Sequence, residues 1–260
     1  MAPLTFRLLG QGIAYSASPA MMAAAFEAMG LPHRYELADL PPERVDEAVE
    51  RLRTPGRGGA NVTTPHKLAV ADRCDALSPD AALLSAVNCV VRDGGRLTGH
   101  NTDLPALVDE LRGLRPDGVG RAVLLGGGGA GRAVEVALER AGARSIERIQ
   151  RRDGSWDRLG DALAGADLVV NATPVGTGSD ESPVPAEHLR PDLAVLDLVY
   201  RPSPTRLVRD ARAAGAPATG GAGMLLGQGW RSLELWLGRL APVEAMRAGL
   251  RSTLGADADV

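Results

Sequence analysis

The segment around the only lysine of the chain carries the side chains best suited to acid–base chemistry. Residues 61–67 read Asn-Val-Thr-Thr-Pro-His-Lys, which places an amide, hydroxyls and an amine around a proline turn. Lysine and arginine together number 29, yet every one of them except Lys67 is arginine. Arginine keeps its proton at any working pH, whereas lysine gives its proton up when its surroundings favour the neutral amine. We therefore interpret Lys67 as a proton-transfer group, with a solvated surface lysine as the simpler alternative.

Further short polar side chains stand where predicted strands end. Asn88 follows an apolar run, and Asn101-Thr102-Asp103 follows Gly99-His100. Such side chains suit a polyhydroxylated ligand, because every buried hydroxyl of the ligand needs a hydrogen-bond partner. Ser16 and Ser18 add two hydroxyls just before Pro19, and they either bind the same ligand or cap the helix that follows.

A glycine run indicates a nucleotide site. Gly126, Gly128 and Gly131 have the spacing G-x-G-x-x-G, after an apolar strand and at the start of a helical pattern. In that context the glycines let the backbone approach a pyrophosphate at a helix N-terminus. A flexible loop in a glycine-rich chain is the alternative.

The segment that should meet the adenine ribose carries conflicting signals. It reads Gln150-Arg151-Arg152-Asp153, about 20 residues after the glycine run. Arginines suit the 2′-phosphate of NADP, whereas an aspartate accepts hydrogen bonds from the free ribose hydroxyls of NAD and repels a phosphate. Residues alone leave the choice between NAD and NADP open, and a solvated turn is the structural alternative.

The elements that position these residues alternate between strand and helix, which predicts an α/β fold whose second half has a parallel sheet. The tail at 256–260 is expected to fray. Strands are predicted at 5–9, 34–39, 58–63, 86–91 (turning at 93–95), 121–125, 145–150, 168–171 and 194–198, and helices at 19–29, 42–52, 107–114, 132–141 and 224–240.

Composition excludes several classes of protein. The chain has 260 residues and a net charge of −3, which gives no support to nucleic-acid binding through bulk charge. No apolar run is long enough to span a membrane, and residues 1–12 lack the pattern of a signal peptide. Two cysteines imply no disulfide framework. We expect a cytoplasmic protein without a metal, a nucleic-acid partner or a membrane partner.

Taken together, the motifs resemble the shikimate dehydrogenase family, which includes the quinate/shikimate dehydrogenases, over nearly the whole chain. The matching segments are Ser16 to Pro19 (S-x-S-P), Asn61 to Lys67 (N-V-T-x-P-H-K), Ala86 to Asn88 (A-V-N), Asn101 to Asp103 (N-T-D), Gly126 to Ala130 (the glycine-rich loop), Asn171 to Pro174 with Gly176 (N-A-T-P-x-G), Asp197 with Tyr200 (D-x-x-Y), and Gly223 to Leu225 with Gln228 (G-M-L-x-x-Q).

The resemblance implies two domains with a cleft between them. An α/β substrate-binding and catalytic domain would cover 1–103, and a Rossmann-type nucleotide domain with a parallel sheet would cover 104–222. C-terminal helices at 223–260 would return to the substrate domain. Lys67 and Asp103 would be the catalytic pair. The substrate would be held by Ser16, Ser18, Asn61, Thr63, Asn88, Tyr200 and Gln228. The dinucleotide would be held by Gly126, Gly128, Gly129, Ala130, Gly131, Arg151, Arg152, Asp153, Thr173, Gly223 and Met224.

The implied reaction is the reversible reduction of 3-dehydroshikimate to shikimate with NADP or NAD, in the chorismate pathway to the aromatic amino acids. Some positions depart from the family pattern: Met22-Ala23, Cys89, Leu104 and Ala106. Residues 150–158 resemble the quinate/shikimate branch, which can use NAD. Alternatives are therefore a quinate/shikimate or aminoshikimate dehydrogenase, or a nucleotide-sensing binding protein of the same fold. The implied molecule is a monomer or a homodimer.

Overall fold

The computed structural model describes residues 2–260, except that the side chains of Gly129 and Ala130 lie outside the description. The chain divides into two compact units, and each unit contains one β-sheet. Unit 1 comprises Met1–Asp103 and Leu226–Thr253, and unit 2 comprises Leu104–Leu225 and Leu254–Val260. Across the described residues, no helix is both long enough and apolar enough to cross a membrane.

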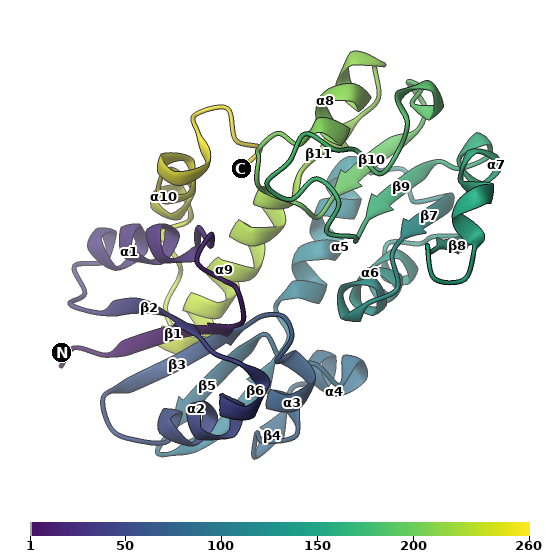
Figure 1. The fold of residues 1–260 in the computed structure, drawn as a ribbon. Helices are drawn as coiled ribbons and strands as arrows, with labels where there is room; N and C mark the ends of the chain where they lie inside the picture. Colours follow the sequence, from purple (N-terminus) through teal and green to yellow (C-terminus); the bar gives the residue numbers. More distant parts are fainter. Residues whose placement is uncertain (1) are drawn as a thin grey trace. The chain divides into compact units, whose positions relative to one another are not determined.

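The sheet of unit 1 has six strands in the order β2-β1-β3-β5-β6-β4 (Figure 1). It is mixed, because β5 runs antiparallel to both β3 and β6 while the other pairs are parallel. The strands are β1 (Thr5–Gly10), β2 (Arg34–Asp39), β3 (Arg57–Val62), β4 (Ala76–Leu77), β5 (Cys89–Asp93) and β6 (Arg96–His100). The helices are α1 (Ser18–Ala28), α2 (Val45–Leu52), α3 (Lys67–Ala71), α4 (Pro79–Leu84), α10 (Val243–Leu254) and the part of α9 (Gly221–Leu237) from residue 226 on.

Alternation along β1 gives unit 1 a core on each face of its sheet. Phe6 points to one face, where its ring lies 5.4 Å from Phe26 of α1 and 4.7 Å from Trp236 of α9. Leu9 points to the other face and packs with Val49 of α2. Residues one apart on a strand face opposite sides, so this short strand anchors helices on both faces. Figure 1 shows α1 and α10 on one side of the sheet and α2 on the other.

The sheet of unit 2 is parallel throughout, in the order β11-β10-β9-β7-β8. Its strands read as short apolar runs because both faces are covered. Val123 and Leu125 of β7 point into a core shared with α7 and α8. The strands are β7 (Arg121–Leu125), β8 (Ser145–Ile149), β9 (Leu168–Asn171), β10 (Ala194–Asp197) and β11 (Ala218–Thr219). The helices are α5 (Asp103–Leu114), α6 (Gly129–Arg140), α7 (Leu159–Ala164), α8 (Arg206–Ala213) and the first turn of α9.

The α/β class predicted from the sequence is confirmed, and one local expectation is wrong. The end of the chain is ordered against unit 2, whereas fraying was expected for 256–260. Ala258 is 4% exposed, and the Asp259 carboxylate pairs with the Arg212 guanidinium at 2.8 Å. Residues 226–253 cluster with unit 1, and residues 254–260 cluster with unit 2.

Candidate active site

Lys67 and Asp103 form an ion pair in unit 1. The Lys67 Nζ lies 2.7 Å from the Asp103 Oδ2, and the two side chains are 31% and 11% exposed. A lysine nitrogen held by one carboxylate, and still open to a ligand, can give a proton as the ammonium or take one as the amine, at a defined position. The structure therefore brings together the two residues that the sequence singled out for proton transfer.

Backbone contacts fix the start of α3, where Lys67 lies. The His66 side chain is buried, and its Nε2 lies 2.9 Å from the Leu40 carbonyl oxygen after β2. The Lys67 carbonyl accepts a hydrogen bond from the Val87 N–H at 3.0 Å. His66 is thus a structural anchor, and the lysine stem leaves a fixed point of the backbone.

Asp103 is positioned by the residue before it. The Thr102 N–H donates to the Asn88 Oδ1 at 2.7 Å, and the Asn88 Nδ2 donates to the Thr102 Oγ1 at 2.9 Å. This reciprocal pair fixes the first turn of α5, where Asp103 is the first residue. The Asn88 amide keeps one Nδ2 hydrogen beyond these contacts, so it can also serve a ligand.

Asn61 is occupied inside the protein. Its Oδ1 accepts from the Tyr35 hydroxyl at 2.9 Å, and its Nδ2 donates to the Asn88 carbonyl at 3.1 Å and to the Ser232 Oγ at 2.9 Å. Both amide hydrogens are therefore used, and one acceptor lone pair is left. Since Asn61 is 4% exposed, its contacts favour a supporting role over a direct grip on substrate.

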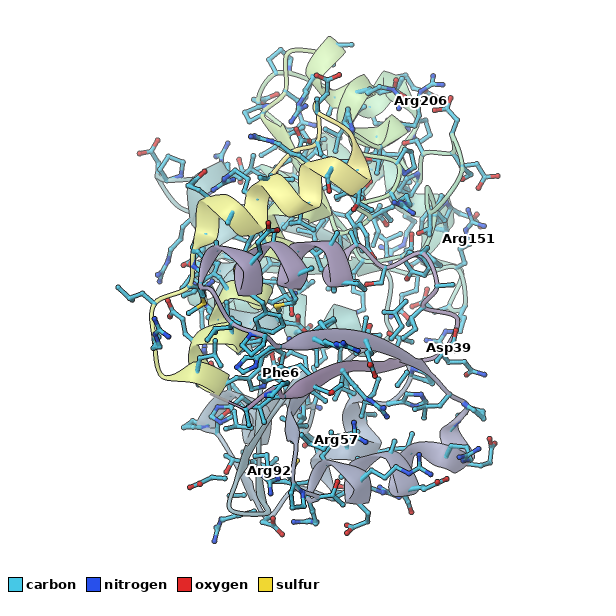
Figure 2. The ribbon with its side chains drawn as sticks, turned by 90° about the vertical axis from the view of Figure 1, so that its left-hand side faces the viewer. Phe6, Asp39, Arg57, Arg92, Arg151 and Arg206 are labelled. Atoms are coloured by element: carbon cyan, nitrogen blue, oxygen red, sulfur yellow. The ribbon has the colours of Figure 1, made fainter. Side chains whose placement is uncertain are left out.

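Ser16 and Ser18 stand at the start of α1. The Ser18 N–H donates to the Ser16 Oγ at 3.2 Å, which is a local turn contact, and the cap residue Ala17 provides no side-chain cap. The preceding loop is held by Asp39, whose carboxylate accepts from Gly12 N–H at 2.9 Å and Ile13 N–H at 3.2 Å. Asp39 lies at the end of β2 (Figure 2).

The glycine-rich loop of unit 2 follows β7 and leads into α6. Gly126 follows β7 with φ +107°, and a Cβ there would lie 3.1 Å from the Ala172 carbonyl oxygen. A Cβ at Gly128 would meet no described atom within 4 Å, so this backbone faces open space at the N-terminus of α6. A Cβ at Gly131 would lie 3.3 Å from the Gly126 carbonyl oxygen. Gly129 and Ala130 begin α6, and their side chains lie outside the described part.

The turn after β8 is built by Asp153 and Ser155. The Ser155 N–H donates to the Asp153 Oδ1 at 2.9 Å, and hydrogen bonds from Ser155 lower the pKa of the Asp153 carboxyl. Arg151 and Arg152 are exposed, and the Arg151 guanidinium lies 4.9 Å from the ring centre of Trp156. Asp153 thus has a structural task that the sequence reading had weighed only as an alternative.

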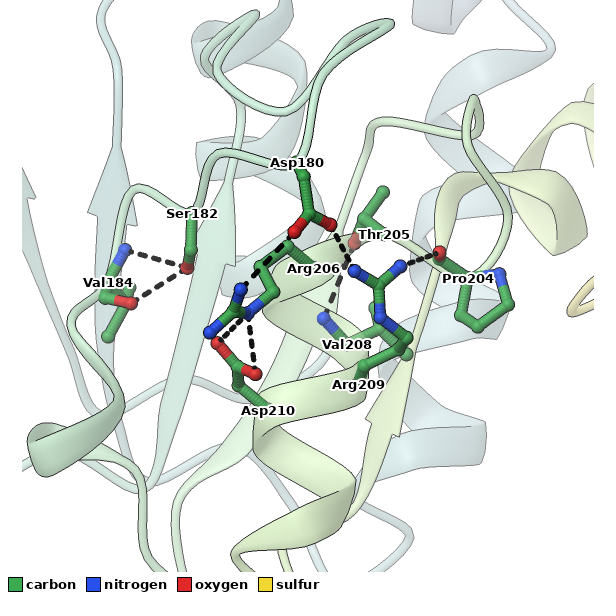
Figure 3. Close-up of polar contacts among 9 residues, drawn as sticks. All are labelled: Asp180, Ser182, Val184, Pro204, Thr205, Arg206, Val208, Arg209 and Asp210. Atoms are coloured by element: carbon green, nitrogen blue, oxygen red, sulfur yellow. Dashed lines mark hydrogen bonds and ion pairs between the residues drawn. The ribbon is translucent and has the colours of Figure 1, made fainter.

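A pocket of about 410 Å³ adjoins this turn. Arg151 and Trp156 line one part of it, and an ion-paired group from the N-terminal half of α8 lines another. Figure 3 shows that group: Arg206 contacts both Asp180 and Asp210, and Arg209 contacts Asp180. The arginines of α8 are therefore already neutralised, which leaves Arg151 as the lining arginine whose charge is free of an ion pair among the described contacts.

A buried polar cluster supports the loop after β9. The Asn171 Oδ1 accepts from the Thr173 N–H at 3.0 Å, and its Nδ2 donates to the Asp197 Oδ1 at 2.8 Å. The Asp197 Oδ2 accepts from the Thr205 hydroxyl at 2.7 Å, and burial raises the pKa of this carboxyl. Tyr200 follows three residues after Asp197, so the cluster holds the backbone near both Thr173 and Tyr200.

Of the remaining predicted residues, Thr63 directly follows β3, and Gly223, Met224 and Gln228 lie on α9. Gly223 is in its first turn, where a Cβ would lie 2.6 Å from the Glu110 Oε1, and burial raises the pKa of Glu110. Met224 follows it in unit 2, whereas Gln228 belongs to unit 1. The described residues contain no cluster of three or more histidine, cysteine or acidic side chains that could hold a metal ion.

Sequence reasoning missed Tyr35, Asp39 and Ser232. Tyr35 and Ser232 contact Asn61, and Asp39 holds the loop before Ser16. Each belongs to an ordinary strand or helix pattern, so no local motif marks it. Only the pairing of distant segments brings these side chains to the site.

Comparison with known proteins agrees with this geometry. Residues 8–90 match the family model of the shikimate dehydrogenase substrate binding domain, and residues 221–251 match the shikimate 5′-dehydrogenase C-terminal domain. The chain is 41% identical to a shikimate dehydrogenase (NADP(+)) of Natronomonas pharaonis, over 96% of this chain and 99% of that protein.

Two solved structures show the same fold. One is shikimate 5-dehydrogenase from Thermus thermophilus in complex with NADP(H) and shikimate, with a TM-score of 0.84 and 38% identity over 96% of this chain and 100% of that one. The other is quinate dehydrogenase from Corynebacterium glutamicum in complex with NAD, with a TM-score of 0.83 and 30% identity over 96% of this chain and 100% of that one.

Proposed function

Since the chain belongs to the shikimate dehydrogenase family, we propose that it catalyses the reversible NADP-dependent reduction of 3-dehydroshikimate to shikimate. The observation that carries the proposal is the ion pair of Lys67 and Asp103, at 2.7 Å. In this role the enzyme supplies shikimate toward chorismate and the aromatic amino acids, in the cytoplasm.

Lys67 is the proposed proton carrier. When bound, the nicotinamide supplies or accepts the hydride. The protein positions the reacting groups and polarises the carbonyl. During reduction of the ketone, the Lys67 Nζ donates a proton to the oxygen on which negative charge develops. During oxidation, the same nitrogen takes the hydroxyl proton. The Asp103 Oδ2 holds the amine in place.

Short polar side chains are proposed to bind the cyclic acid. We assign the hydroxyls of Ser16 and Ser18, at the start of α1, to the carboxylate or a ring hydroxyl of the substrate. The ring hydroxyls are assigned to Thr63, Asn88, Tyr200 and Gln228. Asn61 is assigned to the support of this group, because both its amide hydrogens are used inside the protein.

The nucleotide is proposed to bind unit 2, whose glycine-rich loop fits a pyrophosphate. Gly126, Gly128 and Gly131 let the backbone approach the phosphates, and the N-terminus of α6 with Gly129 and Ala130 favours their charge. Arg151 and Arg152 suit the 2′-phosphate of NADP. Thr173, Gly223 and Met224 are proposed as further contacts.

We also propose that NAD is a usable second cofactor. Asp153 lies in the turn assigned to the ribose, and its exposed carboxylate can accept a hydrogen bond from a ribose hydroxyl. The similarity to a quinate dehydrogenase in complex with NAD supports the same view.

A steady-state panel tests the proposal. Shikimate and quinate are each offered with NADP and with NAD, and formation of reduced nicotinamide is followed by its absorbance. We expect the highest kcat/KM for shikimate with NADP, and measurable turnover with NAD. Turnover of quinate but not shikimate would assign the enzyme to the quinate branch. Nucleotide binding without turnover of either acid would refute the proposal.

A further inference from the structure

A serine on α9 joins the three segments that carry the proposed proton-transfer and substrate residues. Ser232 is fully buried, and its Oγ lies 2.9 Å from the Asn61 Nδ2, 3.2 Å from the Thr102 Oγ1 and 2.9 Å from the Gln228 carbonyl oxygen. Asn61 lies near the end of β3, ahead of Lys67, Thr102 directly precedes Asp103, and Gln228 is one turn earlier on α9. All of these residues belong to unit 1.

The hydrogen bonds around Ser232 can all be satisfied at once in one arrangement. A serine hydroxyl has one hydrogen and two acceptor lone pairs. If Ser232 donates to the Gln228 carbonyl, both lone pairs are free to accept from Asn61 Nδ2 and from the Thr102 hydroxyl. Thr102 can still accept from the Asn88 Nδ2 at 2.9 Å. The Gln228 carbonyl can only accept, so the single Ser232 hydrogen must point to it. Thr102 must therefore be the donor in the Ser232–Thr102 bond.

We propose that Ser232 is a positioning residue for the dehydrogenase reaction, acting through Thr102 on the Asp103 carboxylate. This inference rests on the proposed function, because it assumes that Asp103 and Lys67 carry the proton. Ser232 does not touch the reacting groups. It fixes the Thr102 hydroxyl, and Thr102 fixes the backbone at the start of α5, from which the Asp103 side chain reaches Lys67.

Removing the hydroxyl should weaken catalysis more than substrate binding. Ser232→Ala leaves one Asn61 hydrogen without this partner in a buried place, and it leaves the Thr102 hydroxyl only its contacts with Asn88, at 2.9 and 3.2 Å, so the loop 101–103 gains freedom. The geometry between a proton donor and its acceptor is sensitive to small displacements. We therefore expect kcat for shikimate oxidation to fall about tenfold or more, while the KM for shikimate changes less than about threefold.

The control separates positioning from loss of stability. Val49 of α2 is fully buried in the core on the other face of the sheet and lies outside this hydrogen-bond network. Val49→Ala destabilises unit 1 by leaving a small cavity. With both variants assayed well below their unfolding temperatures, we expect Val49→Ala to keep the wild-type kcat.

A second pair of variants tests the same path if Ser232→Ala folds poorly. Thr102→Val removes the hydroxyl and keeps the shape, whereas Thr102→Ser keeps the hydroxyl. We expect the valine variant to lose kcat as Ser232→Ala does, and the serine variant to restore most of it. In the double variant of Ser232→Ala with Thr102→Val the losses of kcat should be less than additive, because both variants remove the Ser232–Thr102 bond, while Thr102→Val also removes the acceptor of the Asn88 Nδ2.

The outcomes distinguish this inference from the proposed function. A wild-type chain without shikimate turnover would overturn the proposed function. A wild-type chain that turns shikimate over, with a Ser232→Ala variant within twofold of its kcat, would overturn the inference alone. Equal losses of kcat in Ser232→Ala and Val49→Ala would also overturn it, since stability would then explain both.

Discussion

Lys67 is the residue on which the chemistry depends most, and its identity carries information because the chain otherwise uses arginine. Its amine and the Asp103 carboxylate lie 2.7 Å apart. A guanidinium could form the same ion pair, but it would not exchange a proton. Under the proposed function, proton transfer and not charge accounts for the lysine at this one position.

Lys67→Arg should abolish most turnover and leave nucleotide binding unchanged. Positioned acid–base groups contribute about 10²–10⁴-fold to rate, so kcat should fall by at least that range. Nucleotide affinity, measured by a fluorescence titration, reports on unit 2 and should stay at the wild-type value. A charge-preserving exchange on the surface, Arg44→Lys, is the control. A Lys67→Arg variant with half the wild-type rate would contradict the assigned role.

Asp153 decides how well NAD competes with NADP, if its carboxylate meets the ribose. Asp153→Asn keeps an oxygen for the Ser155 N–H and removes the charge, so the turn survives. The ratio of kcat/KM for NADP to that for NAD should then rise tenfold or more, which corresponds to about 1.4 kcal/mol. Asp157→Asn, in the same loop, should leave the ratio alone. An unchanged ratio in Asp153→Asn would mean that the carboxylate serves only the turn.

At the scale of elements, the loop between β1 and α1 depends on a clamp from another strand. The Asp39 carboxylate at the end of β2 accepts two backbone N–H groups, from Gly12 and Ile13. Gly12 has φ +68°, a conformation that glycine adopts without strain. The loop leads to Ser16 and Ser18, so β2 sets the place of side chains assigned to the substrate.

Asp39→Ala should therefore raise the KM for shikimate while changing kcat little. The loop loses two hydrogen bonds to a carboxylate, and substrate must then order it on binding. We expect a rise of about tenfold, equal to about 1.4 kcal/mol. Glu36→Ala is the matched control, because it removes an exposed acid from the same strand. Steady-state kinetics on both variants tests this prediction. If the KM of Asp39→Ala equals that of Glu36→Ala and of the wild type, the loop keeps its shape without Asp39.

Local patterns predicted the elements of unit 2 well, because its strands are short apolar runs covered on both faces. The ranges 121–125 and 168–171 agree with β7 and β9. The sequence did not predict the strand β6 or the antiparallel direction of β5. Strand pairing depends on contacts between residues that are far apart in the sequence, and local patterns do not report these contacts. The same limit hid Ser232, which contacts Asn61 across 171 positions of the chain.

At the scale of the whole molecule, two histidines of unit 1 and two buried carboxyls of unit 2 should respond to acid in opposite directions. In unit 1, burial lowers the pKa of His33 and of His100 below the ordinary value of 6.5. In unit 2, burial raises the pKa of Glu110 and of Asp197. Protonation of a buried histidine costs stability, whereas protonation of a buried carboxyl relieves a cost.

The sign for unit 1 follows from linkage. Because the folded pKa values of His33 and His100 lie below the unfolded value of 6.5, the unfolded chain binds more protons as the pH falls through that range. Stability is therefore complete above about pH 7 and is lost as the pH drops below about 6.5, by at most about 1.4 kcal/mol per pH unit for each histidine. In unit 2, the raised pKa values of Glu110 and Asp197 have the opposite effect. These two carboxyls add stability as the pH falls through their range, which lies below that of the histidines.

Tryptophan fluorescence can follow unit 1 alone. Trp230 and Trp236 belong to unit 1 and Trp156 to unit 2, so a Trp156→Phe background reports only on unit 1. In that background, urea unfolding should show lower stability at about pH 5.5 than at about pH 7.5. His33→Gln and His100→Gln should each reduce this difference, whatever they do to stability at neutral pH. His188→Gln, in unit 2, should not. An unchanged pH difference in the His33→Gln, His100→Gln double variant would show that these buried histidines do not set the acid sensitivity of unit 1.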